Sequence, residues 1–469
     1  MNISRRKWLQ GTGVMAGAMA GFSAPSQGAE VASGEVLFQK KLEVRYNVDI
    51  FIAGGGPAGI AAAVAARKQN AEVFLAEGHS CLGGMGTAAL VPVFMQMGDG
   101  VHFLAEGVGR EVVNRLKEER QLSHAHDIEA LKRVYDTMLT EAGVRFTFYT
   151  QLSDVVAEDG KIQYVICSAP SGMFAVKAKI YIDATGNGDL AVWAGAAYEK
   201  GDAQGNLMPG TLCSQWSGID WKTWREKRPK IVQPDGYRLA EAFADGVFTV
   251  KDEHLTGMHQ LGENLGGGNI GHVFGVDGTD EKSLTEGLIW GRKSMKEYAR
   301  YYTEYLPGFE NAKLVATGSL LGIRETRRIL GDYVLCLDDY QKRAVFPDEI
   351  GRYAYPIDIH PIQTGQESYE QHRKEFDEKF RYAKGESYGI PYRILTPRGL
   401  DNLLVAGRCV SMDTYVHGSL RVMPGCFITG QAAGIAASMA AEQGVSVHQV
   451  SVPTLQQKLK TFGAYLPNA

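Results

Sequence analysis

The sequence of 469 residues has few cysteines, little excess of either charge and no long apolar run. Its six cysteines show no Cys-x-x-Cys spacing, which argues against a small disulfide scaffold or a zinc module. The formal net charge of −4 leaves no basic surface for nucleic acid. Apolar residues make up 45% and charged residues 22%, which excludes a mostly disordered chain, a coiled coil and a collagen. The length allows a large core and two or three structural units.

The N-terminus has the features of an export signal. Ser4-Arg5-Arg6 is followed by a short Gly/Ala-rich apolar stretch, from residue 11 to about residue 24. A basic start before such a stretch predicts a signal peptide, and the paired arginines resemble the twin-arginine type. We therefore expect residues 1–29 to direct export to the periplasm, with no stable membrane span because the apolar stretch is too short. The twin-arginine route carries folded proteins, so the signal also predicts a cofactor that is inserted before export.

A dinucleotide-binding motif begins near residue 48. Val48–Ala53 is a nearly continuous apolar run, typical of a buried parallel strand, and a glycine-rich turn, a small-residue helix over 60–67 and a second strand over 72–76 follow. In this context the first glycine makes a tight turn, the second lets the backbone approach a pyrophosphate, and the third lets helix and strand pack closely. An acid after the second strand binds ribose hydroxyls and disfavours NADP. The candidate residues are Gly54, Gly56, Pro57, Ala58, Gly59 and Glu77.

A second glycine cluster follows this acid, at residues 78–87. With it the sequence resembles the FAD-dependent oxidoreductases of the glutathione-reductase-like fold, and more narrowly a broad bacterial family with a G-G-M-x-T segment after the ribose acid. The resemblance extends from about Tyr46 to Gly444 and includes an A-T-G turn over 183–189, residues 322–328, an A-G-R-C turn over 402–409, and residues 421–426. It implies FAD as the cofactor and adds these FAD-contacting candidates: Gly83, Gly84, Met85, Thr87, Ala184, Thr185, Gly186, Gly407, Arg408 and Gly425.

The predicted fold class is α/β. We expect a Rossmann-like FAD-binding domain with three layers, a parallel sheet and a β-meander, together with an inserted α+β substrate domain. The FAD-binding domain is predicted over residues 45–197 and 396–445, the insertion over 198–395, and a C-terminal tail over 446–469. A small-residue helix over 427–441 belongs to the FAD-binding domain. In the resembling fold the N-terminus of this helix points at the flavin and stabilises its anionic reduced form.

Local patterns predict individual elements. Turns at 159–160 and 171–172 predict three meander strands between residues 153 and 182, and Asp127 predicts the start of a helix that ends near residue 142. Gly266–Gly271 repeats the glycine pattern without an apolar strand before it, so we expect a loop there. Trp290–Tyr305 is charged and aromatic, which predicts a surface helix. His124 and His126 precede the helix at Asp127 and predict a solvated loop, with no matching third ligand for a metal.

Four residues are candidates for the chemistry beside the flavin: His417, Tyr415, Arg421 and Arg324. His417 and Tyr415 lie between two flavin-contacting segments and are the candidate proton donors or bases. The two arginines are candidates to hold an anionic or carbonyl oxygen. Structural roles are the alternatives: a hydrogen-bonded turn residue for the histidine, and an interdomain ion-pair cluster for the arginines, with neighbouring residues 327 and 328.

The cysteines leave further alternatives open. Cys81 is followed five positions later by Gly86, where dithiol flavoenzymes carry a second cysteine, so a disulfide-reductase mechanism is disfavoured. Cys409, Cys426 or His417 could bind FAD covalently, although no spacing demands it. We expect most of the thiols to be buried.

The sequence therefore favours an exported FAD-dependent oxidoreductase that transfers a hydride between a small organic substrate and FAD. It has no second Rossmann signature for NAD, which favours a quinone, a cytochrome or oxygen as electron partner, with a periplasmic or membrane carrier. An enoate-type reductase is one alternative. A non-catalytic flavin protein that relays electrons or binds a ligand is the other. The resemblance predicts the cofactor better than the substrate.

Overall fold

The computed structural model describes residues 29–31, 35–119, 125–231, 238–253, 257–365, 368–370, 374 and 380–469. It consists of two compact units, Met1–Glu43 and Val44–Ala469. In the first unit, β1 (Ala29–Val31) pairs antiparallel with β2 (Glu35–Leu37). The predicted twin-arginine motif and apolar stretch lie outside the described residues. Everything below concerns the second unit.

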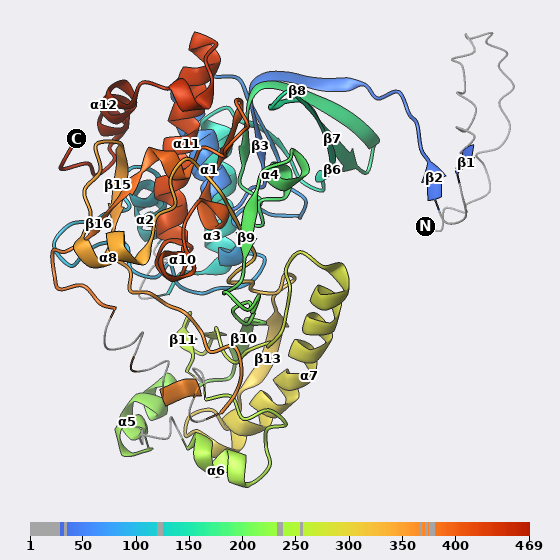
Figure 1. Ribbon diagram of the computed structural model, residues 1–469. Helices are drawn as coiled ribbons and strands as arrows, with labels where there is room; N and C mark the ends of the chain where they lie inside the picture. The colour runs from blue at the N-terminus through green and yellow to red at the C-terminus, as the bar shows by residue number, and fades with distance from the viewer. Residues whose placement is uncertain are drawn as a thin grey trace, which may run out of the picture. The chain divides into compact units, whose positions relative to one another are not determined.

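A seven-stranded sheet lies in the upper part of Figure 1. Its order is β5-β4-β3-β8-β7-β6, and β17 pairs with the C-terminal end of β8. The pairs among β5, β4, β3, β8 and β17 are parallel, whereas β8, β7 and β6 form an antiparallel meander. The predicted α/β class is confirmed, and the meander turns fall where the sequence predicts them. The strands are β3 (Val44–Ala53), β4 (Val73–Ala76), β5 (Arg145–Thr147), β6 (Gln151–Glu158), β7 (Lys161–Ala169), β8 (Gly172–Asp183) and β17 (Leu403–Val405).

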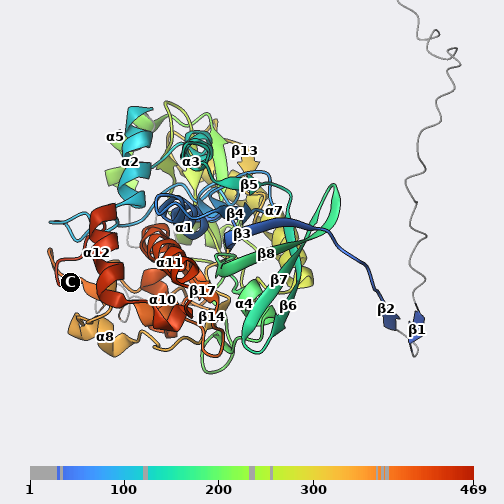
Figure 2. The same cartoon turned by 90° about the horizontal axis from the view of Figure 1, so that it is seen from above.

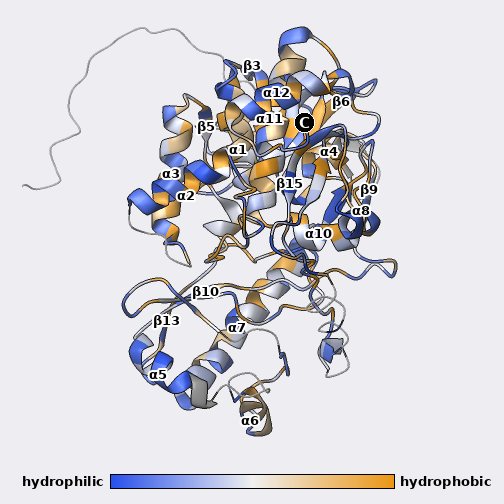
Figure 3. Ribbon diagram, turned by 90° about the vertical axis from the view of Figure 1, so that its left-hand side faces the viewer, coloured by the Kyte–Doolittle hydropathy of each residue, from blue (hydrophilic) through white to orange (hydrophobic). Residues whose placement is uncertain are grey.

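Two helices of small residues, α1 (Pro57–Arg67) and α11 (Met423–Gln443), pack side by side against this sheet (Figure 2). A Cβ at Gly430 would lie 2.2 Å from the carbonyl oxygen of Ala58, so only glycine permits this approach of the two backbones. Helix α11 is buried along almost its whole length, and it begins four residues before the predicted start. In Figure 3 it carries much of the apolar colour, whereas α5 (Trp221–Ile231) is largely hydrophilic.

Further helices cover the same layer. Helices α2 (Val108–Glu118) and α3 (Ile128–Glu141) pack with α1, and the Asp127 side chain accepts a hydrogen bond from the backbone N–H of Ala130, which confirms the predicted helix start.

Within the described residues no single helix has the length and hydropathy of a membrane span. Only α10 (Thr414–Leu420) and α11 taken together, across a bend of 93°, meet those criteria.

A second, four-stranded antiparallel sheet lies in the lower part of Figure 1. Its order is β11 (His259–Gln260), β12 (Gly266–Gly268), β10 (Ser214–Ser217) and β13 (Lys313–Thr317). The loop predicted at Gly266–Gly271 is therefore wrong for its first three residues, which form a buried strand. A Cβ at Gly266 would lie 2.6 Å from the Ile219 side chain, so close packing and not a phosphate explains this glycine.

Helix α7 (Glu281–Tyr305) accompanies the second sheet, together with α5 and α6 (Leu239–Ala244). The prediction of a surface helix over Trp290–Tyr305 is only half right. One face of α7 buries Tyr298, Tyr301 and Tyr302 in an aromatic core with Trp216. The helix is amphipathic, and its buried face is made of tyrosines rather than aliphatic residues.

The remaining elements include two small two-stranded sheets and several helices. Most apolar side chains between Ile329 and Leu395 pack into the core of the seven-stranded sheet, although this segment precedes residue 396. The predicted domain boundaries stay a prediction. These elements are α4 (Asp189–Trp193), β9 (Tyr198–Lys200), β14 (Arg327–Ile329), α8 (Leu337–Lys342), β15 (Glu349–Tyr353), β16 (Tyr388–Pro391) and α12 (Val452–Phe462), with short 3-10 turns at Gly84–Gly86, Tyr392–Ile394, Gly407–Cys409 and Val447–Gln449.

Candidate active site

A cavity of about 580 Å³ runs between the edge of the seven-stranded sheet and residues of the second sheet region. Its volume is in the range of cofactor and ligand sites. One end is lined by the glycine motif and Glu77, and the other by residues from several separate segments. The structure thus brings together these sequence candidates along one wall: Gly54, Gly56, Pro57, Ala58, Glu77, Gly84, Met85, Ala184, Thr185, Gly186, Arg324, Gly407, Arg408 and Arg421.

The glycine turn between β3 and α1 is shaped for a pyrophosphate. Gly54 has φ +95°, which a residue with a side chain rarely adopts, and a Cβ at Gly59 would lie 1.9 Å from the Gly54 carbonyl oxygen. A Cβ at Gly56 would meet nothing within 4 Å and would project into open space, at a position that lines the cavity. Helix α1 begins here without a side-chain cap, so its first N–H groups are free to bind an anion.

Glu77 occupies the end of β4, where the motif requires a carboxylate. Its Oε2 accepts a hydrogen bond of 2.7 Å from the Gly55 N–H, and its Oε1 accepts one of 2.8 Å from the His79 N–H. His79 Nδ1 lies 2.9 Å from the same Oε1, and this contact, against the opposing effect of burial, raises the pKa of His79. A carboxylate has about four lone-pair positions, so capacity remains for a ribose hydroxyl. The backbone contacts hold the carboxylate in place for that role.

The turn after β8 closes the same end of the cavity. Asp183 is fully buried, and its carboxylate accepts hydrogen bonds from Thr185 and from the Ala191 N–H. Burial raises the pKa of Asp183 to about 6, although these hydrogen bonds oppose the shift. Arg408 donates to the Gly186 carbonyl at 2.9 Å, to Asn187 Oδ1 at 2.7 Å and to the Ile323 carbonyl. Arg408 therefore connects both predicted FAD turns to the segment that carries Arg324.

Arg324 is the most distinctive side chain at the other end. It is 7% exposed, and its Nη1 donates 2.8 Å hydrogen bonds to the Pro209 carbonyl and to Thr211 Oγ1. It forms no ion pair with any carboxylate among the described residues. Burial, and then the charge of Arg421, lowers the pKa of Arg324 to about 10, so it stays cationic at neutral pH. Arg327 and Arg328, by contrast, pair with Asp189 and Glu325.

Arg421 and Asp358 complete this end. Arg421 Nη2 donates to the Asp358 backbone carbonyl at 2.8 Å and to its Oδ2 at 3.1 Å, and His360 Nε2 lies 3.3 Å from Asp358 Oδ1. Burial alone would raise the pKa of Asp358, but His360, Arg421 and Arg324 outweigh it and hold this pKa well below its usual value. Two arginines thus face one carboxylate, which leaves a net positive charge at the cavity wall. The sequence gives no local signal for Asp358 or His360, and both were missed.

Apolar groups form much of the wall between the two ends. Met85, Val91, Met95, Met423 and Cys426 line the cavity. The first turn of α11 borders it through Val422, Met423 and Cys426, and this helix also lacks a side-chain cap at its N-terminus. An uncapped helix N-terminus stabilises negative charge on a bound group, and an apolar wall suits a flat, mostly apolar ring such as that of a flavin. The glycine-motif end and this apolar wall therefore fit FAD.

Several sequence candidates lie behind the cavity wall. Gly59, Gly83, Thr87 and Gly425 do not line the cavity but shape its turns; Thr87 Oγ1, for example, donates a 2.5 Å hydrogen bond to the Leu82 carbonyl. His417 and Tyr415 are also outside the lining. His417 is fully buried on α10, and burial together with the charge of Arg421 holds its pKa well below its usual value. Tyr415 is 39% exposed. The predicted proton-transfer roles of these two residues stay predictions.

The described cysteines and histidines form neither a disulfide nor a cluster that could hold a metal. All six cysteines are described, none is in a disulfide, and four of them are buried: Cys167, Cys213, Cys409 and Cys426. No cluster of metal-ligating side chains occurs within the described part of the chain. His124 lies outside the described residues. The solvated loop predicted at His126 is wrong, because this ring is fully buried and packs 4.3 Å from the Phe94 ring.

Comparisons with known proteins identify the class of cofactor. The sequence model of the family described as FAD dependent oxidoreductase matches residues 49–459. No curated protein is significantly similar in sequence. Among solved structures, a geranylgeranyl bacteriochlorophyll reductase-like protein from Thermoplasma acidophilum is 14% identical, with 89% of this chain and 83% of that chain covered and a TM-score of 0.44. L-proline dehydrogenase from P. horikoshii is 13% identical, with 89% and 98% covered and a TM-score of 0.41.

Proposed function

The chain belongs to the FAD dependent oxidoreductase family, and we propose that it is an exported member that transfers a hydride between a small organic anion and FAD. Family membership makes it an FAD-dependent oxidoreductase. The anionic character of the substrate is our inference from the cavity. Export rests on the paired Arg5-Arg6 signal in the sequence.

FAD, when bound, supplies a ring atom that accepts or returns a hydride. The residues that would hold it are the glycine turn, Glu77, the turn after β8 and the first turns of α1 and α11. The apolar side chains of Met85, Val91 and Met95 would exclude water from the flavin end of the cavity. Excluding water strengthens every charge interaction at that end.

The buried cation of Arg324 is the observation that carries the substrate proposal. A buried guanidinium without a carboxylate partner costs free energy unless a counter-ion is supplied. Its planar donors suit a carboxylate. Arg421 already pairs with Asp358, whereas Arg324 pairs with no carboxylate among the described residues. Arg324 is therefore the cation that is available to an anionic ligand. A substrate carboxylate bound there would lie in the same cavity as the apolar wall assigned to the flavin.

His360 is the group at this end that can accept a proton from the substrate, because it lines the cavity beside Arg324. Asp358, which the neighbouring cations hold ionised, stabilises the protonated ring. Burial and the charge of Arg324 hold the pKa of His360 well below its usual value, so its ring is a base at neutral pH. A quinone, a cytochrome or oxygen would complete turnover as the electron partner.

An anaerobic titration of the purified protein tests this proposal. Pools of small carboxylates and matched uncharged analogues are added while the flavin absorbance is followed. We expect one carboxylate pool, and not its uncharged analogues, to bleach the band if the enzyme is a dehydrogenase. In the enoate-type reductase alternative, dithionite bleaches the band and a carboxylate pool restores it. A band that responds to no carboxylate, or equally to uncharged analogues, contradicts the substrate class.

Two variants separate binding from folding. Arg324→Met is expected to keep FAD but to raise the KM for the carboxylate by about 100-fold, the typical effect of losing a charged hydrogen bond. Arg327→Met is the matched control from the same segment, since Arg327 pairs with Asp189 and does not line the cavity. Equal losses in both variants would contradict a specific role for Arg324.

For export, replacing Arg5 and Arg6 by lysine is expected to leave the protein in the cytoplasmic fraction.

A further inference from the structure

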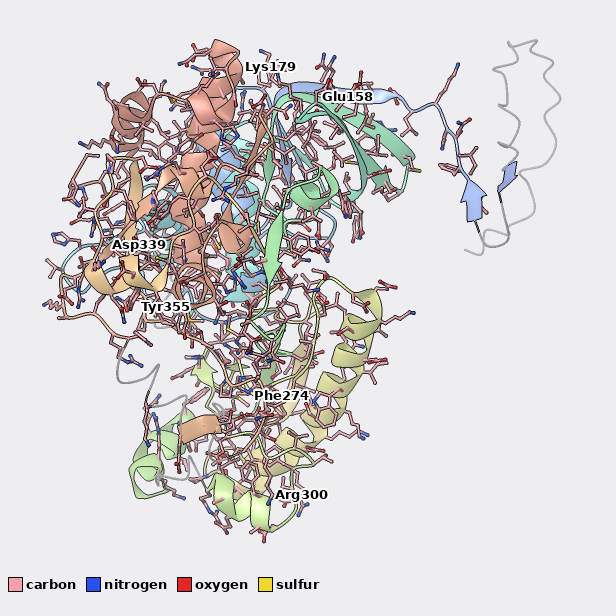
Figure 4. The ribbon with its side chains drawn as sticks, in the orientation of Figure 1. Glu158, Lys179, Phe274, Arg300, Asp339 and Tyr355 are labelled. Carbon is pink, nitrogen blue, oxygen red and sulfur yellow. The ribbon has the colours of Figure 1, made fainter. Side chains whose placement is uncertain are left out.

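Three neighbouring segments extend the second sheet beyond its strands to the cavity. Before β10, Gly210 pairs antiparallel with Val273, and Thr211 pairs antiparallel with Gly322. These bridges continue the order of the sheet, in which β10 lies between β12 and β13. In Figure 4, Phe274, which comes directly after Val273, lies among the side chains of the second sheet region. The segments before β10, after β12 and after β13 therefore lie side by side where they reach the cavity.

Thr211, Cys213 and Asn269 belong to the face of these segments that lines the cavity. Thr211 and Cys213 are two residues apart on one extended segment, so their side chains point to the same side. Ser214 pairs with Gly268 in the sheet, and this register places Asn269 beside Cys213 on the neighbouring segment. The side chains meet there, since Cys213 Sγ donates a hydrogen bond of 3.5 Å to Asn269 Oδ1.

The Cys213 thiol fixes the orientation of the Asn269 amide. Burial, opposed by the charge of Arg324, raises the pKa of this thiol to about 12, so it is an S–H donor at neutral pH. The amide oxygen accepts from it, whereas the reverse orientation would offer the amide N–H only a weakly accepting sulfur. Asn269 Nδ2 makes no hydrogen bond with any residue that the structure describes. Because Asn269 lines the cavity, its two N–H groups are available to a ligand.

Arg324 is held at the same face. Its Nη1 donates to Thr211 Oγ1 at 2.8 Å, and the Thr211 hydroxyl donates to the Gly271 carbonyl at 2.7 Å. Thr211 therefore orients Arg324 and has no proton left for a ligand. Arg324 Nε and Nη2 make no hydrogen bond within the described part of the chain. The groups that this face offers to a ligand are thus two donors, the Arg324 cation and the neutral Asn269 amide.

The spacing of these two donors suits a small molecule. Arg324 is bonded to Thr211 and Asn269 to Cys213, and two residues span about 7 Å along an extended segment. A hydrogen bond covers about 3 Å, so one ligand reaches both donors when only a few bonds separate its two acceptor groups. The cation suits a carboxylate. The neutral amide suits an uncharged oxygen, because a second buried carboxylate would need a second cation.

We propose that Asn269 gives the site a preference for small carboxylates with a second acceptor oxygen, a carbonyl or hydroxyl oxygen on the first or second carbon beyond the carboxylate. This preference rests on the proposed function, because Arg324 is the group that binds the carboxylate. Asn269 contacts the substrate and determines specificity. Cys213 is a positioning residue that acts through the Asn269 amide.

Binding of matched acids to the oxidised, FAD-loaded protein tests this preference. The pairs are propanoate with 2-oxopropanoate and butanoate with 3-oxobutanoate, and calorimetry measures each Kd. We expect the oxo acid of at least one pair to bind about tenfold more tightly than its parent acid, the typical effect of one net hydrogen bond. In Asn269→Leu, which has a similar shape and no donor, this preference should disappear. Equal binding within both wild-type pairs, or a preference that survives in Asn269→Leu, overturns the proposal.

Asn264→Leu is the matched control, because Asn264 lies in the turn between β11 and β12 and does not line the cavity. It should keep the wild-type preference. Asn269→Ala should lose the preference as Asn269→Leu does, and it covers the case in which the leucine variant does not fold.

Two variants of Cys213 test its positioning role. Cys213→Ser keeps a donor to the amide oxygen and should keep the preference for the oxo acid. Cys213→Ala leaves the amide free to rotate, and the preference should fall from about tenfold to about threefold. A role of Cys213 in packing alone would instead change the Kd of both acids of a pair together.

Arg324→Met separates this preference from the proposed function. It should weaken both acids of a pair by a similar factor. If it weakens neither, the carboxylate proposal fails, and the uncharged pair propanamide and 2-oxopropanamide then tests Asn269 without Arg324. A wild type that prefers the oxo amide, with the preference lost in Asn269→Leu, supports the role of Asn269, and equal binding of the two amides overturns it. Acids that respond to Arg324→Met but show no oxo preference overturn the role of Asn269 while the proposed function stands.

Discussion

The two ends of the cavity differ in the groups that form them: one is mainly backbone and the other is mainly side chains. The dinucleotide end is mainly backbone from short contiguous stretches: the Gly54–Gly59 turn, the start of α1 and the turn after β8. The other end is made of single side chains from separate segments, among them Arg324, Asp358 and Arg421. Most residues of a backbone site cannot be replaced without altering the fold, whereas a side-chain site can be changed one residue at a time. The first therefore fixes the cofactor and the second sets the reaction.

At the backbone end, the substitution with the largest expected effect is Gly59→Ala. The new methyl would lie 1.9 Å from the Gly54 carbonyl oxygen, so the turn and α1 must separate. We expect the free energy of unfolding to fall by about 3 kcal/mol, as for other overpacked sites. Urea unfolding of the apoprotein measures this loss. FAD binding should be lost as a consequence.

Gly56→Ala is the matched control for that variant. Its methyl meets nothing within 4 Å, and Gly56 has φ −70°, which alanine accepts. The apoprotein should lose no more than about 0.5 kcal/mol of stability. FAD content should nevertheless fall, because the methyl projects toward the space assigned to the pyrophosphate. If Gly56→Ala retained full FAD content, that assignment would be wrong.

The side-chain end is tested by Asp358→Asn, which removes one negative charge between two arginines. FAD content should not change, because Asp358 does not belong to the dinucleotide end. Turnover should fall about 100-fold, because the proton-accepting His360 ring loses the carboxylate beside it. Acetate should bind about tenfold more tightly, since the site gains one unit of positive charge. Acetate binding is read from its perturbation of the flavin absorbance, and unchanged binding would contradict the charge argument.

His126 packs behind the wall between the two ends and makes stability depend on pH. Its backbone N–H donates to the Pro92 carbonyl at 3.0 Å, and burial lowers the pKa of the ring to about 4. The neutral ring is favoured in the fold, so its contribution is complete above the unfolded pKa of about 6.5 and is lost as pH falls toward 4. Between pH 7.5 and 5 the loss should be about 2 kcal/mol. Urea midpoints of the wild type and His126→Phe over this range measure it, and parallel curves would contradict it.

The sequence predicts the two ends unequally, for the same physical reason. A glycine turn between a strand and a helix depends on residues that are neighbours in the sequence. The dinucleotide-binding role of the residues from Gly54 to Glu77 could therefore be predicted from the pattern alone. The meander was also predictable, because its turns are local. Asp358 and His360 were not, since their meaning arises only when Arg324 and Arg421 are folded against them. His126 looked solvated because nothing in the sequence shows the Phe94 ring that covers it.

The smallest effect is expected at Cys81, which lies at the backbone end near the second glycine cluster. Its Sγ lies 3.8 Å from Thr87 Oγ1, it is in no disulfide, and burial raises the pKa of its thiol, so it is not a thiolate at neutral pH. Cys81→Ser should therefore keep full FAD content, change turnover less than about twofold and change stability by less than about 0.5 kcal/mol. Wild-type protein treated with a thiol reductant is the control and should behave identically. A large loss of turnover in Cys81→Ser alone would mean that this end, too, contributes a reacting side chain, and the division between a cofactor end and a reaction end would fail.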